Sequence, residues 1–301
     1  MTHDNTEKQQ GHISVMPKEV MEYLSVQPGE FIIDGTFGGG GHSGMIAEAL
    51  QGDGMMLLVD RDETAYKRAQ AFKPKGIKTH AAFANYSEIR ETLESKKLPK
   101  ADGILLDLGF SSLQLEEGRG FSFQKDEPLL MTYSDNEEPL KNLLRQMSKQ
   151  EIADVIYNYS GERYSRKIAE AIWKAERKKK IETTGELVEI IKSTLPQKYE
   201  GGRINPATRT FLAFRIFANK EIEHLRKVLD DLPEILAPGG RAVIITFQSL
   251  EDREVKEKFK ALNKAGEIEI LTKKPIPVSY EEQKQNPRAR SAKIRVAQRA
   301  K

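Results

Sequence analysis

Cysteine is absent from the 301 residues of this chain, and this absence excludes disulfides, a thiolate nucleophile and a thiolate metal site. The five histidines show no His-x3-His spacing, so we expect no structural metal. Apolar runs long enough to span a bilayer are also missing, and residues 1–11 are polar, without the apolar stretch of a signal peptide. These absences favour a soluble cytoplasmic protein with a flexible leader.

Acidic residues are missing from the last part of the chain. Seven Lys or Arg residues and no Asp or Glu lie between Gln283 and Lys301, although the net charge of the whole chain is only +3. A second basic cluster lies mid-chain at Lys174 and 177–180. Either cluster alone is more often a solvated face, but local basic excess in a near-neutral chain suggests a polyanionic partner.

Short apolar segments alternate with helical patterns at both ends of the chain. We expect four strands, separated by helices, at 31–37, 54–60, 77–83 and 103–108. The alternation stops over 114–205, where apolar residues recur at helical spacing, and it resumes with strands expected at 241–247, 267–271 and 292–297. The pattern predicts an α/β fold with a mostly parallel, seven-stranded sheet and an inserted helical domain. The predicted boundaries are 1–113, 114–205 and 206–301.

A run of glycines follows the first expected strand, in the stretch Asp34-Gly35-Thr36-Phe37-Gly38-Gly39-Gly40-Gly41-His42. Glycine reaches positive φ without steric cost and lets a ligand lie against the backbone. Free N–H groups at the start of the following helix attract electron-rich ligand atoms. The stretch therefore predicts a ligand held close to this loop.

Acids end three of the expected strands, at Asp34, Asp60 and Asp107. Asp60 lies about twenty residues beyond the glycines, where an acid can accept both ribose hydroxyls, so a nucleoside-bearing cofactor is predicted. Residues 39–44 fit the G-x-G-x-x-G pattern of nicotinamide dinucleotide sites. S-adenosylmethionine fits better, because the acids would attract its positive charge and would repel a pyrophosphate. The alternative for each acid is a helix cap or a surface turn.

The chain resembles the bacterial ribosomal RNA small-subunit methyltransferase H family, which methylates N4 of a cytidine in 16S rRNA. The resemblance rests on motif blocks that run in family order over nearly the whole chain. They are His12–Val20, Asp34–Ser43, Asp60–Asp62, Ile104–Gly109, Ser111-Ser112, Gln114-Leu115, Arg119–Phe123, Pro206–Phe211, Leu236–Arg241, Ser249–Arg253 and Asn286–Ser291.

The resemblance implies a class I, Rossmann-like methyltransferase that uses S-adenosylmethionine on 16S rRNA within the small ribosomal subunit. The implied cofactor contacts are Gly40, Gly41, His42, Asp60, Phe83, Asp107 and Gln114. Three positions depart from the family pattern and remove ionisable groups on the expected substrate side. Leu130 stands where the family usually has Asp, and Asn205 and Gln248 each stand where it usually has His.

Methyl transfer to an exocyclic amine needs a group that orients the amine and accepts its proton. We expect the Asp107 carboxylate, with the Leu108 carbonyl, to do this at the end of the fourth strand. Phe110 is predicted to stack on the target base, the alternative being a core aromatic. Contacts to RNA are predicted for Arg209, Arg288 and Arg290. Two other functions remain open at this point, a nicotinamide-dependent dehydrogenase and a non-catalytic RNA-binding factor.

Overall fold

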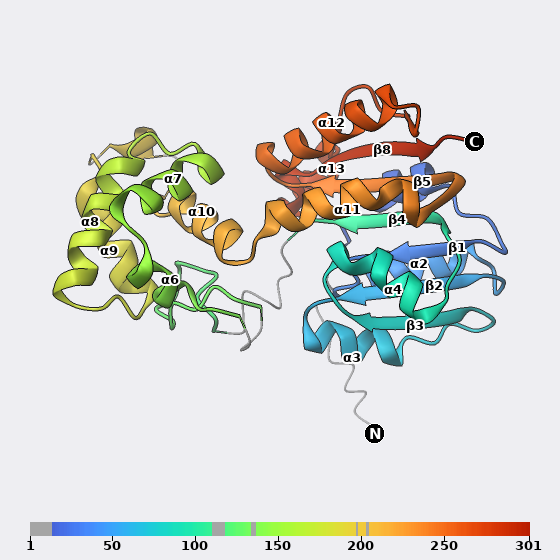
Figure 1. Ribbon diagram of the computed structural model, residues 1–301, viewed down its shortest axis with the longest axis horizontal. Coiled ribbons are helices and arrows are strands. Elements are labelled where there is room, and N and C mark those ends of the chain that lie inside the picture. The colour runs from blue at the N-terminus through green and yellow to red at the C-terminus, as the bar shows by residue number, and fades with distance from the viewer. Residues whose placement is uncertain (1–13, 110–117, 134–136, 197, 203–204) are drawn as a thin grey trace, which may run out of the picture. The chain divides into compact units, whose positions relative to one another are not determined.

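The computed structural model describes residues 14–109, 118–133, 137–196, 198–202 and 205–301. Contacts within the chain divide it into two compact units. The first, called the sheet unit, comprises residues 1–109, 231–248 and 259–301, and the second, called the helical unit, comprises 110–230 and 249–258. Figure 1 shows the strands of the first and the helices of the second.

The sheet unit is built on one sheet with the strand order β3-β2-β1-β4-β5-β8-β6 (Figure 1). The first five pair in parallel, and β8 pairs antiparallel with β5 and β6. The predicted mostly parallel seven-stranded sheet is confirmed, and a two-residue strand, β7, adds an eighth member beside β8. The strands are β1 (Phe31–Asp34), β2 (Met55–Asp60), β3 (Lys78–Phe83), β4 (Ala101–Asp107), β5 (Leu236–Thr246), β6 (Ile268–Ile270), β7 (Ile276–Pro277) and β8 (Lys293–Arg299).

Helices connect the parallel strands as the sequence predicts. Residues Ile32, Leu105 and Val243 of neighbouring strands lie in one buried apolar cluster with Val20 and Leu24 of the first helix. Burial on both faces accounts for the continuous apolar runs of these strands. The helices are α1 (Pro17–Leu24), α2 (Gly41–Ala49), α3 (Glu63–Ala71), η1 (Tyr86–Glu88), α4 (Ile89–Lys96), α13 (Tyr280–Gln285) and η3 (Pro287–Ser291), together with parts of α11 (Glu221–Ile235) and α12 (Ser249–Lys264).

The helical unit has its own apolar core. Two of its helices begin with a capping box, in which Ser148 pairs with Glu151 and Thr183 pairs with Glu186. Each box satisfies N–H groups that the first turn of a helix leaves without a backbone partner. The helices are α6 (Leu140–Gln146), α7 (Lys149–Ser160), α8 (Ser165–Lys178), α9 (Thr184–Thr194), η2 (Tyr199–Gly202) and α10 (Thr208–Ala218), with the remaining parts of α11 and α12.

The helical unit extends beyond the predicted insertion of residues 114–205. Phe211 and Phe214 of α10 are buried in one cluster with Ile156 of α7 and Leu187 of α9. The predicted boundary at residue 206 assigned α10 to the sheet domain, whereas its aromatic residues complete the helical core. The helical unit accordingly extends to residue 230 and also includes residues 249–258.

Candidate functional site

The sheet reverses its strand order beside β1. From β1 the chain continues to β2 and β3 on one side, and β4 then pairs with the other side of β1. Ligands of open α/β sheets bind beyond the carboxyl ends of the strands at such a reversal. The carboxyl ends of β2, β1 and β4 are therefore the expected place for a ligand, and each of these strands ends in an aspartate.

The three aspartates lie at two depths. Asp34 is level with Leu58 of β2 and Leu105 of β4, so Asp60 and Asp107 each lie two residues farther along their strands. At about 3.3 Å per residue, this difference is about 7 Å. Asp34 is accordingly 1% exposed, whereas Asp60 and Asp107 are half-buried at the strand ends.

Asp34 forms hydrogen bonds within the protein. Its Oδ2 accepts a hydrogen bond from the Ser43 hydroxyl at 2.6 Å, and its Oδ1 accepts one from the Thr36 N–H at 3.1 Å. Burial raises the pKa of the Asp34 carboxyl above its ordinary value, against the opposing effect of the Ser43 hydrogen bond. Asp34 fastens the loop after β1 to α2, and its burial sets it apart from the surface turn considered as an alternative.

The glycine turn between β1 and α2 depends on glycine for two different reasons. Gly38 and Gly40 have φ values of 51° and 78°, in the left-handed region that favours glycine. A side chain at Gly40 would also place its Cβ 2.8 Å from the buried ring of Phe37. Gly39 and Gly41 are exposed, and α2 begins at Gly41. The turn thus offers bare backbone at the start of a helix, as the sequence predicts.

Asp60 and Phe83 are direct neighbours at the ends of β2 and β3. The Asp60 oxygens accept one backbone N–H each, from Gly38 at 2.8 Å and from Asp62 at 2.9 Å. Burial raises the pKa of the Asp60 carboxyl. The Phe83 ring is 54% exposed and lies 5.4 Å from the ring of Tyr66. An acid fixed to the glycine turn therefore stands beside an exposed aromatic ring.

Asp107 and His42 face each other near the end of β4. His42 is 8% exposed, and its Nε2 lies 2.9 Å from the carbonyl oxygen of Val15. Because a carbonyl only accepts, this contact places a proton on Nε2 and leaves Nδ1 directed at Asp107 Oδ2, 3.9 Å away. The other oxygen, Oδ1, accepts the Gly109 N–H at 3.0 Å.

Three residues that the sequence did not single out shape this site. The Thr36 hydroxyl accepts the Asp107 backbone N–H at 2.8 Å, and Ser43 binds Asp34. The ring of Phe247, which follows β5, lies against Gly109. A Cβ added at Gly109 would be only 2.8 Å from this ring. Thr36 and Ser43 flank the glycine run in sequence, but the contact of Thr36 with Asp107 is known only once β1 and β4 are paired.

The predicted RNA contacts fall in different places. Arg209 lies in the helical unit, where its guanidinium is 3.7 Å from the buried Glu162 carboxylate and 3.3 Å from the Tyr199 hydroxyl. Arg290 is exposed in η3 of the sheet unit. Phe110 and Gln114 lie outside the described residues, and the Arg288 side chain is not described.

One of the departures from the family pattern has a local structural role. Asn205 precedes α10, and its Oδ1 accepts the Ala207 N–H at 2.9 Å.

Among the described residues no group of three His, Asp or Glu side chains is placed to hold a metal ion. No helix in the described part of the chain is long and apolar enough to cross a membrane.

A parallel sheet with a glycine turn after β1 and acids at adjoining strand ends is typical of nucleoside-binding α/β proteins. A model of the MraW methylase family matches residues 9–300. A Desulfotalea psychrophila protein named Ribosomal RNA small subunit methyltransferase H is 40% identical over 291 residues, covering 96% of this chain and 98% of that protein. The protein of the same name from Wolbachia sp. subsp. Drosophila simulans is 43% identical over 299 residues, covering 96% and 99%.

The chain therefore belongs to the MraW methylase family, and it is a methyltransferase. This decides against the nicotinamide-dependent dehydrogenase. A solved structure of an rRNA methylase from Streptococcus thermophilus covers 96% of this chain and 99% of its own, with a TM-score of 0.43 and 9% identity. A likeness of that size carries no argument about the site.

Proposed function

We propose that this methyltransferase transfers a methyl group from S-adenosylmethionine to N4 of a cytidine in 16S rRNA of the small ribosomal subunit. Family membership, the names of its relatives and the ordered motif blocks support this proposal. The observation that carries it is the pairing of Asp60 and Phe83 at the ends of β2 and β3, together with Asp107 at the end of β4 on the other side of β1. Binding and transfer are assigned to this edge of the sheet unit.

The residues present fit the nucleoside part of this cofactor. Each Asp60 oxygen accepts one backbone N–H and keeps a further lone pair, so the carboxylate can accept both ribose hydroxyls. The exposed ring of Phe83 offers an apolar surface to the adenine. The bare backbone of Gly40 and Gly41 leaves room for close approach.

S-adenosylmethionine, when bound, would supply a methyl group from its positively charged sulfonium, with the S–CH3 bond breaking to leave a neutral thioether. The chain must orient the amine and take up a proton as the new C–N bond forms. We assign the proton to the Asp107 carboxylate, whose Oδ1 is held by the Gly109 N–H. The amine also needs an acceptor that directs its second hydrogen, and the Leu108 carbonyl is assigned that role.

The RNA contacts stay predictions of this proposal. Arg290 is exposed in the basic tail, as a phosphate contact must be. Arg209 is engaged by Glu162 and Tyr199 within the helical unit. A role in RNA binding therefore requires Arg209 to contact RNA from within this group of side chains. Its side chain is 28% exposed.

The deciding experiment supplies labelled S-adenosylmethionine and small ribosomal subunits from cells that lack this activity. We expect label in 16S rRNA and, after mapping, on N4 of one cytidine. Subunits that bind the protein without accepting label would overturn the proposal and favour a non-catalytic RNA-binding factor. Label on another base would overturn the N4 assignment alone. NAD is expected not to bind.

Site variants separate binding from transfer. Asp60→Ala and Phe83→Ala should weaken S-adenosylmethionine binding at least tenfold, about 1.4 kcal/mol. Asp107→Asn keeps the size of the side chain and should lower turnover about a hundredfold or more. Asp102→Asn is the matched control, because Asp102 lies at the opposite end of β4 and binds the Phe31 N–H. Equal turnover in the two Asn variants would remove Asp107 from the reaction.

A further inference from the structure

One face of α8 is buried and mostly apolar, and the opposite face is exposed and basic. Ser165, Ile168, Ala169 and Ile172 are buried. At about 100° per residue they cover an arc of about 100°. The far side of the helix carries five exposed bases within about 120°, and we call them the basic face: Arg166, Lys167, Lys174, Arg177 and Lys178. Three residues of the mid-chain basic cluster, Lys174, Arg177 and Lys178, therefore belong to a longer stripe that begins at the second residue of the helix.

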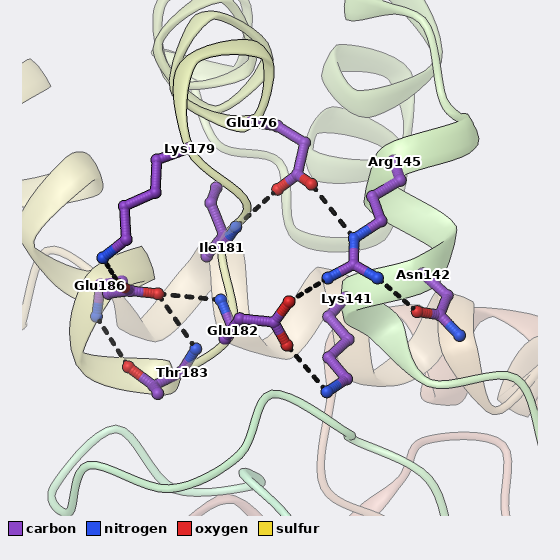
Figure 2. A network of polar contacts seen from close by, with 9 residues as sticks. All are labelled: Lys141, Asn142, Arg145, Glu176, Lys179, Ile181, Glu182, Thr183 and Glu186. Atoms are coloured by element: carbon purple, nitrogen blue, oxygen red, sulfur yellow. Dashed lines mark hydrogen bonds and ion pairs between the residues drawn. The ribbon is translucent and has the colours of Figure 1, made fainter.

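Acids near α8 do little to neutralise this stripe. Glu176 accepts from Arg145 Nε at 3.3 Å and from the Ile181 N–H at 2.8 Å, within the network of Figure 2. Glu162, just before the helix, is fully buried and accepts from the Tyr199 hydroxyl. Glu170 is the acid that lies among the five bases, and it pairs with Lys174 at 2.8 Å. The basic face keeps an excess of positive charge.

One base of the stripe is held in place by an aromatic ring. The Arg177 guanidinium lies 3.5 Å from the centre of the Trp173 indole. A stacked guanidinium loses less freedom when it binds a phosphate, and its planar N–H groups match two phosphate oxygens. From Arg166 to Lys178 the stripe runs about 18 Å along the helix axis, which suits a row of charges better than a single anion.

We propose that the basic face of α8 holds backbone phosphates of the RNA substrate. This inference rests on the proposed function, because that function supplies the RNA. A membrane surface fits less well: amphipathic helices bind bilayers through their apolar face, and that face of α8 is buried in the helical core. Phosphate contacts of this kind carry no sequence information and fix how the substrate is held.

The test removes three charges from exposed positions, in the triple variant Arg166→Gln, Lys167→Gln, Lys178→Gln. The matched control removes three exposed charges from the sheet unit, in Lys75→Gln, Lys78→Gln, Lys96→Gln. Affinity for unmethylated small subunits, and for a 16S rRNA fragment, is measured over a series of salt concentrations. Each lost phosphate contact should reduce the magnitude of the slope of log affinity against log salt concentration by about 0.7 to 0.9, hence by about 2 to 3 for the triple variant.

The control variant should keep the wild-type slope, and a charge-preserving triple, Arg166→Lys, Lys167→Arg, Lys178→Arg, should keep it too. Equal slopes for the triple and the control would overturn the inference. Loss of binding to anionic phospholipid vesicles, with RNA affinity unchanged, would overturn it in favour of a membrane surface. If the wild type transfers no methyl group while the slopes differ as expected, the proposed function fails and the phosphate surface stands.

Discussion

The strand-end carboxylates of the sheet unit and the Glu182 carboxylate of the helical unit are held in two different ways. At the strand ends of the sheet unit, Asp60 accepts backbone N–H groups, and Asp34 accepts one together with a hydroxyl from the adjoining helix. In the helical unit, Glu182 accepts from the side chains of Lys141 and Arg145 (Figure 2). Backbone donors are placed by the fold, whereas cationic side chains must first be ordered. The carboxyl ends of the strands are therefore the more rigid setting, suited to one small ligand.

The largest effect is expected in the core of the helical unit. Phe214 of α10 is fully buried, so Phe214→Ala should lower the free energy of unfolding by about 3–5 kcal/mol. Hydrogen exchange should accelerate in α7 and α10 while the amides of β1 and β4 keep their protection. Equal acceleration in both units would show that they open together.

A smaller difference in stability is expected between substitutions at two glycines with left-handed backbone conformation, one from each unit. Gly161 ends α7 with φ 66° and open space around it, so Gly161→Ala should cost about 1–2 kcal/mol of backbone strain. Gly40→Ala meets the same strain and also the Phe37 ring at 2.8 Å. We expect it to cost more in urea unfolding and to weaken cofactor binding. Equal costs would mean that Phe37 yields and that the turn is less rigid than its geometry indicates.

A pH-dependent effect is expected for Asp34. Burial raises the pKa of its carboxyl above 3.8, so the folded chain holds this proton more tightly than the unfolded chain. The resulting stability is present below pH 3.8 and is lost as the pH rises through the folded-state pKa. Asp34→Asn has no such proton, so its stability relative to the wild type should rise as the pH increases above 3.8. A constant difference in urea midpoints would contradict this.

The smallest effect is expected at the exposed end of the network in Figure 2. Glu182 is 45% exposed, and Glu182→Gln should leave the thermal midpoint unchanged. Glu176 is 9% exposed and binds both Arg145 and the Ile181 N–H, so Glu176→Gln should cost about 1 kcal/mol. A reversed order would show that burial does not decide the strength of these pairs.

Much of the sheet edge follows from the sequence because its signals are local. The glycine run lies between a strand and a helix, and Asp60 and Asp107 end strands, as their patterns predict. The role of Asp34 was not predictable in the same way. Its depth depends on strand register, which places it two residues behind its neighbours, and one sequence gives no register between β1 and β4.

The helical unit was predicted less fully. Apolar spacing showed that it is helical, but not which helices share its core. α10 carries a motif block of the family and follows the predicted boundary, yet Phe211 and Phe214 pack with α7 and α9. The two-residue β7 contains Pro277 and has no alternating pattern, so its pairing with β8 arises from tertiary packing alone. The paired state of Arg209 likewise depends on a Glu that lies 47 residues earlier in the sequence.

The order of synthesis gives the pairing of β4 with β5 a further meaning. These strands are neighbours in the sheet, but residues 110–230 lie between them in the chain. A ribosome therefore releases β1 to β4 while β5 is still unmade. Until then β4 is an apolar strand with one open edge, the kind that pairs readily with other chains. A nascent chain of about 230 residues is thus the stage at which protection by a chaperone matters most.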